Sequence, residues 1–357
     1  MLKRAFFAFA AALAVLPLFA DLTLKNAELA DATLIARFDN APFQGSFFDK
    51  KIKEFQEQQI AANPDLKDMK ALEAMLPPGT QEKAKIMVVS NENMEDAPNP
   101  EALKDKLLIA LEYPQSVKPL FDAIPALTAL KPEVAEKVTI TPTKVGEYAA
   151  LEITAKKDGR KFVTVISNSG TVFLIGSPEL VKQAVTAPQT FGPAPAKTLN
   201  AVADAPSALV IVLPQSLKAT IKDGLHNDES LPPEAKAALA GIDSVAFTFT
   251  SSPEDITIAI QGIFQNDTEA AALKTSLLDT MVVPAGKQML PSLLGPEFEF
   301  PQTIASLQKG TLAGLSVKLT EKDCNAFKPM FDDAAAKLLK AKALDVPGET
   351  VETQDEE

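Results

Sequence analysis

The chain has 357 residues, of which 46% are hydrophobic, and a formal net charge of −12 at neutral pH. An apolar fraction of this size is normal for a globular protein and too high for an intrinsically disordered one. An acidic chain repels nucleic acids and anionic lipid surfaces, because Lys and Arg supply most of the affinity for phosphates. We therefore expect no nucleic-acid partner.

The first twenty residues, MLKRAFFAFAAALAVLPLFA, have the layout of a secretory signal peptide. Lys3 and Arg4 form a basic start, an apolar run follows, Pro17 breaks the run, and Ala20 precedes Asp21. Cleavage there would remove two positive charges and lower the net charge from −12 to −14. We expect residues 1–20 to be removed and the protein to be periplasmic or extracellular.

An uncleaved membrane anchor is the competing interpretation of this segment. A spanning helix needs about 20 apolar residues, and this run is shorter and interrupted by Pro17. Leu18 nevertheless makes the cleavage site imperfect, because a small residue is preferred at that position. We expect no membrane span after cleavage.

The chain has too few cysteine and histidine residues for a fold that is held together by disulfides or by zinc. Cys324 and His226 are the single residues of their kinds, so the chain can form no internal disulfide and no zinc cluster. We expect His226 to lie in a polar loop and Cys324 near a helix start. We predict no metal, no cofactor and no catalytic residue, and a fold that depends on packing alone.

The first half of the chain alternates predicted strands and helices. Apolar periodicity predicts strands at 34–38, 84–90 and 103–113, and helices at 47–55, 64–76 and 115–126. A strand-rich stretch then runs from 137 to 177, with a hairpin turn at Asp158-Gly159. Ser177-Pro178-Glu179 predicts a helix start, because Ser is a good cap and Pro fits the first turn.

The second half repeats this order after a Pro- and Ala-rich stretch, Pro188 to Pro206. Such composition is typical of an extended linker between separate cores. The predicted elements beyond it are a strand in SALVIVL, a helix at 215–223, strands at 244–250, 255–264 and 311–320, and helices at 268–280 and 322–344. The acidic tail, 345–357, has no apolar pattern and is expected to be disordered.

Adjacent alternating strands indicate antiparallel sheets, and grouped helices indicate an α+β fold. We predict two related units, 21–192 and 193–344, each an antiparallel sheet with helices packed on one face. The alternative is a single larger α+β domain whose elements resemble each other by chance.

Three groups of polar residues are possible chemical sites. Glu92, Glu95 and Asp96 form an acidic loop, which we interpret as solvated surface. Ser306 to Lys309 matches S-x-x-K, but the companion motifs of that enzyme class are missing. Glu297 and Glu299 would share one side of an extended segment, and paired carboxylates can catalyse glycoside hydrolysis. Such a pair on a strand usually marks only its solvent-exposed side.

The stretch ADATLIARFD near the start of the chain and the later GTVFLIGSPELVKQAV resemble exported bacterial proteins of unknown function that are built from duplicated α+β units. The resemblance implies such a duplication and a bacterial envelope location, and it transfers no functional residues. We expect a non-enzymatic interaction or binding protein, whose partner is a protein or an apolar ligand. The alternatives are a periplasmic carrier of a lipid or other apolar ligand, and a carboxylate-based hydrolase.

Overall fold

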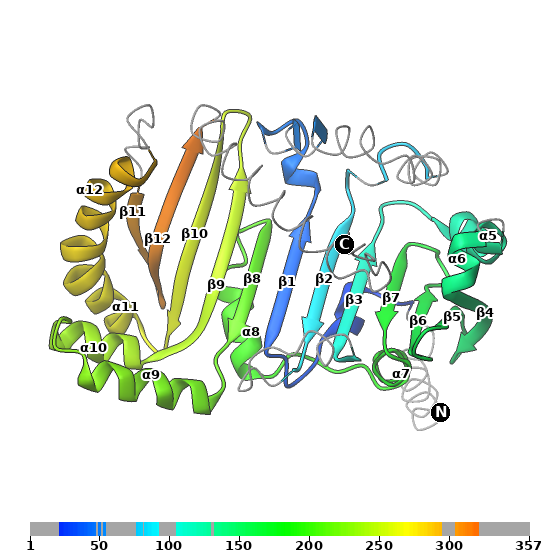
Figure 1. Cartoon of the computed structure of the whole chain (residues 1–357), viewed down its shortest axis with the longest axis horizontal. Coiled ribbons are helices and arrows are strands. Elements are labelled where there is room, and N and C mark those ends of the chain that lie inside the picture. Colours follow the sequence, from blue (N-terminus) through cyan, green and yellow to red (C-terminus); the bar gives the residue numbers. More distant parts are fainter. Residues whose placement is uncertain are drawn as a thin grey trace, which may run out of the picture.

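The computed structural model describes residues 21–294 and 304–320, apart from 48, 51–52, 55–75, 81, 93–104 and 130–131. Its strands form one twelve-stranded sheet in the order β11-β12-β10-β9-β8-β1-β2-β3-β7-β6-β5-β4 (Figure 1). Every neighbouring pair is antiparallel. The antiparallel α+β class predicted from the sequence is confirmed.

The strands of the two predicted units meet at the centre of this sheet, where β1 pairs with β8. The first unit contributes β1 (Leu34–Asp39), β2 (Lys85–Ser90), β3 (Leu107–Glu112), β4 (Val138–Val145), β5 (Tyr148–Ala155), β6 (Lys161–Ile166) and β7 (Val172–Gly176). The second contributes β8 (Ser207–Val212), β9 (Ile242–Ser251), β10 (Asp255–Phe264), β11 (Ile304–Lys309) and β12 (Leu312–Thr320). The order β1-β2-β3-β7-β6 matches β8-β9-β10-β12-β11. Superposition of the two units stays a prediction.

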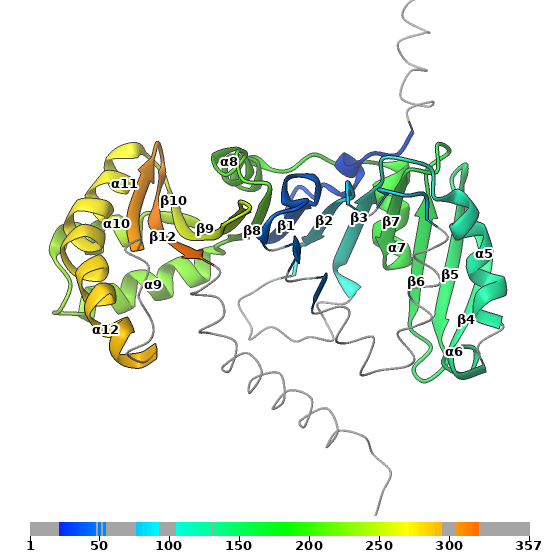
Figure 2. The same ribbon diagram turned by 90° about the horizontal axis from the view of Figure 1, so that it is seen from above.

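Helices pack at both ends of the sheet and behind its centre. They are η2 (Leu24–Ala27), η3 (Ala41–Phe43), α5 (Lys118–Ala129), α6 (Pro132–Lys137), α7 (Pro178–Thr186), α8 (Pro193–Ala201), α9 (Gln215–Asn227), α10 (Pro233–Ala240), α11 (Asp267–Leu273), the π-helix η5 (Lys274–Val282) and α12 (Val283–Leu294). Figure 2 shows α9–α12 gathered at the β11 end, α5 and α6 at the β4 end, and α8 beside the central strands.

One side of the sheet, the core face, carries the main hydrophobic cluster. Ile35, Val89 and Leu108 lie on it with no exposed surface, together with Val210 and Ala246 from the second unit. The segments η2, α7 and α8 contribute apolar side chains to the same cluster. Residues of both units share this cluster. The expectation that the two units have separate cores is therefore wrong for the main hydrophobic cluster.

The stretch Pro188–Pro206 is not an extended linker throughout, because it contains α8. Pro193 and Pro195 fall in the first turn, where a missing N–H costs no helical hydrogen bond. Pro195 and Thr198 are buried, and the Thr198 hydroxyl lies 2.6 Å from that of Ser244 in β9. The prediction of an extended linker from the proline content is therefore wrong for residues 193–201. A proline in the first turn of a helix costs no backbone hydrogen bond, so it does not prevent the helix.

Several local predictions agree with the structure. Ser177 caps α7 by accepting a hydrogen bond from the Leu180 N–H. Gly159 has a φ of +70° in the turn between β5 and β6, a conformation that favours glycine. His226 is a correction, because it lies in the last turn of α9 and not in a loop. That helix continues beyond Asp223 to Asn227.

Candidate binding surface

The register of the sheet brings apolar residues from seven strands into a row on the side opposite the core face. Facing residues of an antiparallel pair project to the same side. The pairs that build this row join Ile109, Val88, Ala36, Leu209, Phe247, Ile260 and Leu315 in that order. We call the side of the sheet that carries this row the outer face.

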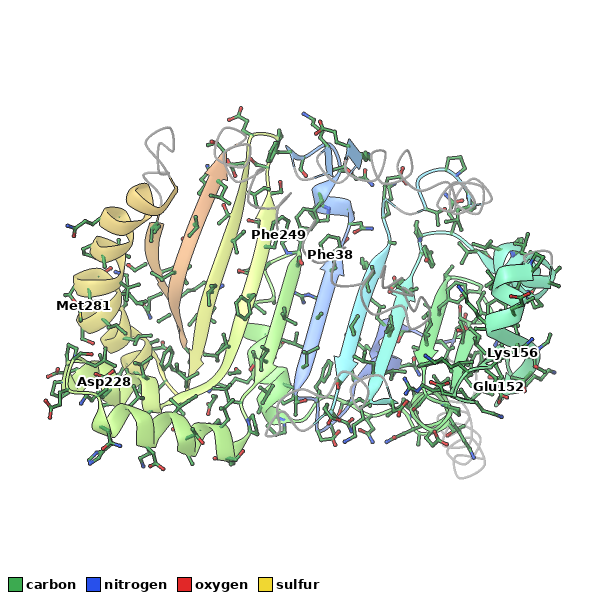
Figure 3. The ribbon with its side chains drawn as sticks, in the orientation of Figure 1. Phe38, Glu152, Lys156, Asp228, Phe249 and Met281 are labelled. Atoms are coloured by element: carbon green, nitrogen blue, oxygen red, sulfur yellow. The ribbon has the colours of Figure 1, made fainter. Side chains whose placement is uncertain are left out.

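A second row lies beside the first on the outer face. It consists of Leu111, Ile86, Phe38, Ser207, Phe249, Ile258 and Val317. Phe43 from η3 packs over this row, with ring centroids 5.0 Å from Phe38 and 5.3 Å from Phe249. Phe38 and Phe249 lie on strands β1 and β9 near the middle of the sheet (Figure 3). Aromatic and aliphatic side chains therefore form a continuous apolar surface there.

The two faces of the central strands differ in exposure. Ile35 and Val210 on the core face have no exposed surface, whereas Phe247 is 36%, Ile258 38% and Ile260 50% exposed on the outer face. At one end of the outer face, α11 and η5 cover Ala313 and Leu315. At the other end, α5 covers Leu111 and Phe173 through a separate apolar cluster. The exposed residues lie between these helical layers.

A contiguous exposed apolar surface on a folded chain usually marks a binding site. Neither of the two rows contains a charged residue. Ser207 is the polar residue of the second row, and Ser306 in β11 faces Leu315 at the end of the first. The surface can therefore bind apolar groups by excluding water.

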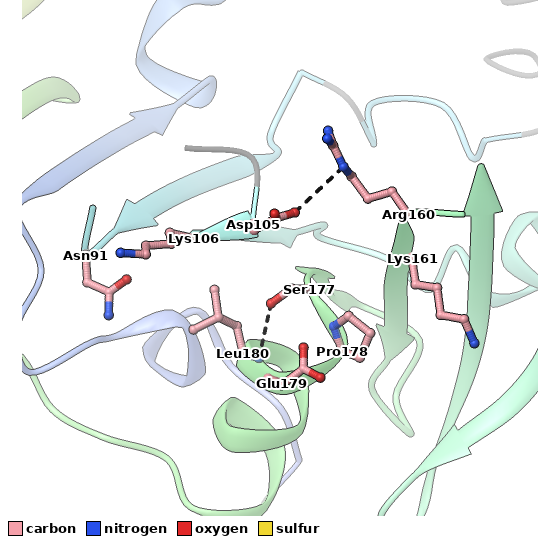
Figure 4. Close-up of a pocket in the computed structure, with 9 residues that line it drawn as sticks. All are labelled: Asn91, Asp105, Lys106, Arg160, Lys161, Ser177, Pro178, Glu179 and Leu180. Atoms are coloured by element: carbon pink, nitrogen blue, oxygen red, sulfur yellow. Dashed lines mark hydrogen bonds and ion pairs between the residues drawn. The ribbon is translucent and has the colours of Figure 1, made fainter. Parts of the chain in front are cut away.

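A polar pocket of about 580 Å³ lies where the N-terminus of α7 faces β3 and β6 (Figure 4). Lys106 Nζ is 3.1 Å from Glu92 Oε2, and Arg160 Nε is 3.9 Å from an oxygen of Asp105. Lys161 Nζ is 2.8 Å from Glu152 Oε1. Each cation of the pocket thus has an acidic partner, and the pocket is a network of surface ion pairs.

Asp243 is held by two lysines, one from α8 and one from α9. It accepts hydrogen bonds from Lys218 Nζ at 2.9 Å and Lys197 Nζ at 3.2 Å, and Lys197 also donates to the Phe264 carbonyl. Partial burial tends to raise its pKa, but the two lysines outweigh burial and hold the pKa of Asp243 below its ordinary value. The group joins α8 and α9 to the sheet.

Asp21 binds the turn between β6 and β7. Its carboxylate accepts hydrogen bonds from the N–H groups of Asn168 and Ser169, both at 2.8 Å, and from Leu22 N–H. Partial burial tends to raise the pKa of Asp21, but these hydrogen bonds outweigh it and lower the pKa. Leu22 is buried in the main cluster.

The structure does not join the polar residues singled out in the sequence into a site. Glu92 pairs with Lys106. Ser306 donates to Asp279, while Lys309 pairs with Asp204. Ser306 and Lys309 are three apart on strand β11, so they project to opposite sides. The other candidates lie outside the described residues: Glu95, Asp96, Glu297, Glu299 and Cys324.

The part of the chain that the structure describes contains no candidate metal centre and no candidate membrane-spanning helix. No group of three or more His, Cys, Asp or Glu side chains in that part of the chain could hold a metal ion. No helix within it has the length and apolar character needed to cross a bilayer.

Comparison with known proteins gives distant structural matches alone. No family model matches the chain. No curated protein matches it by sequence. Crystal form III of TP0453 has a TM-score of 0.44 at 10% identity, covering 86% of this chain and 97% of that one. Crystal forms I and IV of TP0453 have TM-scores of 0.41 and 0.40, at 9% and 11% identity, each covering 86% of this chain and 96% of that one.

Proposed function

We propose that this chain is an exported, non-enzymatic binding protein whose working surface is the outer face of the sheet. One observation carries the proposal: seven apolar residues from seven strands stand in one row, and Phe247 and Ile260 in it are 36% and 50% exposed. At about 25 cal/mol per Å² of apolar area removed from water, such a surface favours a partner that covers it.

The five aspartates whose pKa is shifted behave as structural carboxylates and not as general acids. A carboxylate-based hydrolase needs a general acid whose pKa is raised above its ordinary value. The pKa shifts of Asp21, Asp204, Asp228, Asp243 and Asp279 all run in the opposite direction. Ion pairs and hydrogen bonds cause these shifts, which is the pattern of structural carboxylates.

Export is part of the proposal and rests on the signal-like first twenty residues. Asp21 would be the first residue of the mature protein. Its carboxylate contacts the β6–β7 turn and Leu22 enters the core, so the fold engages the chain directly after the expected cleavage point. Sequencing the N-terminus of envelope-fraction protein tests this step: a start near Asp21 supports export, and an intact Met1 contradicts it.

A carrier of a lipid or other apolar ligand is the second candidate. The observation that favours it is the absence of charged residues from the two central rows of the outer face. A protein partner that uses hydrogen bonds or ion pairs gains little from such a surface, whereas an acyl chain needs neither.

Native mass spectrometry of detergent-free protein from the envelope fraction tests the proposal and separates the candidates. We compare the natural chain with Ile260→Glu, which places a charge on the outer face. Val134→Glu is the matched control, because Val134 is 41% exposed and lies on α6. The proposal predicts a bound species that Ile260→Glu loses and Val134→Glu keeps.

The bound mass then identifies the class: a few hundred daltons indicates an apolar ligand, and a polypeptide mass indicates a protein partner. Retention of the bound species by Ile260→Glu contradicts the outer face as the working surface. Turnover of a model ester or glycoside by the natural chain, abolished by a single carboxylate substitution, contradicts the non-enzymatic assignment.

A further inference from the structure

The sheet is open, so it has two edge strands, β4 and β11, at its opposite ends (Figure 1). An edge strand carries backbone N–H and C=O groups that no neighbouring strand uses, and another chain can add a strand there. At the β11 edge, η5 and α12 pack against the strand, and Ser306 donates to Asp279 of η5. Among the described residues, no strand pairs with the other side of β4. The β4 edge is therefore where the sheet could continue into another chain.

The turn between β4 and β5 fixes which backbone groups of β4 point outward. Val145 faces Tyr148 across the turn Gly146-Glu147, whose glycine has a φ of +60°. The residues that close such a hairpin exchange hydrogen bonds, and every second pair along the two strands does the same. The Lys156 N–H, which donates to the Lys137 carbonyl at 2.8 Å, belongs to this series. The backbone polar groups of the intervening residues point away from β5, and these residues are Val138, Ile140, Pro142 and Lys144.

Pro142 lies in the middle of this outward series. Because proline has no N–H, a donor is missing near the centre of the edge, and the ring occupies space that a neighbouring strand would need. At this register the proline costs no hydrogen bond to β5, so the hairpin tolerates it. Pro142 is exposed, as are Thr141, Thr143 and Lys144 around it. Lys144 also places a charge at the edge, which discourages strand pairing further.

We propose that Pro142 ends the sheet at β4 by preventing a second copy of this chain from pairing with the β4 edge. Two copies related by a two-fold axis would bring their β4 strands together antiparallel. The missing donor then costs the pair one hydrogen bond in each copy. Because helices pack against β11, the assembly without this proline closes as a dimer. The β4 edge is separate from Phe247 and Ile260 on the outer face, so the block at Pro142 does not depend on the proposed function.

Hydrogen exchange of the natural full chain, measured at single-residue resolution, tests the state of the edge. The amides of Ile140 and Lys144 point outward, whereas those of Thr141 and Thr143 donate to β5. The outward amides should exchange at least about a hundredfold faster than the inward ones. Equal protection of all four amides overturns the proposal, because the edge would then already be covered.

A substitution at Pro142 tests the block directly. Pro142→Val restores the missing N–H with a residue that favours strands. Thr141→Val is the matched control, because it adds the same side chain to the same exposed strand at a position whose N–H already donates to β5. Pro142→Ala restores the N–H without a β-branched side chain, and it should act in the same direction as Pro142→Val.

Sedimentation velocity measures the self-association of these full-length variants and of the natural chain. Each regained hydrogen bond should strengthen the association several-fold, so Pro142→Val should raise the dimer association constant at least about tenfold, and Thr141→Val less than about twofold. In the Pro142→Val dimer, the amides at positions 140, 142 and 144 should become protected from exchange.

Unchanged association constants for both Pro142→Val and Pro142→Ala overturn the proposal. An equal rise for Thr141→Val also overturns it, because apolar contact and not the restored N–H would then drive association. A dimer whose amides at 140 and 144 still exchange fast contradicts pairing through β4. Polymers larger than a dimer contradict the two-fold arrangement.

Discussion

Replacing Ile35 with Ala should destabilise both halves of the chain together. Ile35 has no exposed surface and faces Val89 on one side and Val210 on the other. Both neighbours are also fully buried on strands paired at both edges, so the site can contract little around the missing atoms. Buried Ile→Ala substitutions cost about 2–5 kcal/mol, and we expect about 3–4 kcal/mol here.

Hydrogen exchange under native conditions, read peptide by peptide, measures where this loss appears. If one core serves both units, exchange in β9 and β10 accelerates as much as in β2 and β3. Leu34→Ala is the matched control, because Leu34 is adjacent, lies on the outer face and is only partly buried, so its loss should be about 1 kcal/mol. Faster exchange confined to β1–β7 would refute the shared core.

Three further predictions concern backbone, charge and redox state. The added Cβ of Gly224→Ala in α9 meets no atom within 4 Å, so this variant should stabilise the protein by about 0.5–1 kcal/mol. The Cβ of Gly314→Ala would overlap the Ile260 carbonyl, so this variant should destabilise the protein by more than about 2 kcal/mol. Urea denaturation measures both free energies of unfolding, and equal stabilities would contradict the close contact between Gly314 and β10. Asp243→Asn should lower the free energy of unfolding at pH 7 by about 1 kcal/mol. Because the folded-state pKa of Asp243 is lowered, its contribution to the free energy of unfolding is present above the unfolded pKa and disappears as the pH falls through the folded pKa. The difference in stability between the variant and the natural chain should therefore vanish in acid. A stability difference that persists at pH 2 would argue against the ion pairs as its cause. Thermal melts with and without reductant or EDTA should coincide, because one Cys forms no internal disulfide; a drop of more than a few degrees with EDTA would reveal a carboxylate metal site.

Elements whose signals are local could be predicted from the sequence. The strands at 34–38 and 255–264, the Asp158-Gly159 turn and the capped start of α7 depend on alternation, turn chemistry and one side-chain cap. Each signal lies within about ten residues. The structure places all four where the pattern indicates.

Elements that depend on context were missed or misread. The prolines of α8 indicate a linker when counted as composition, but they stabilise a helix start when they occupy its first turn. Short elements such as α10 and β11 carry too few periods to be recognised.

The candidate surface could be predicted only in part. Alternation in Val245-Phe247-Phe249 indicates an apolar side of β9 that needs a cover. Its continuation across β8, β1 and β2 depends on pairing Ala36 with Leu209, residues far apart in the chain. A periodicity argument contains no information on such long-range register.

Photo-crosslinking in cells that produce the protein tests the central claim most directly. A benzoyl-phenylalanine replaces Phe247 in one variant, Ile260 in a second and Val134 in a control, and mass spectrometry identifies each adduct. If the outer face is the working surface, positions 247 and 260 give the same saturable adduct and position 134 does not. Adducts of equal yield at all three positions, or different adducts at 247 and 260, would contradict the account.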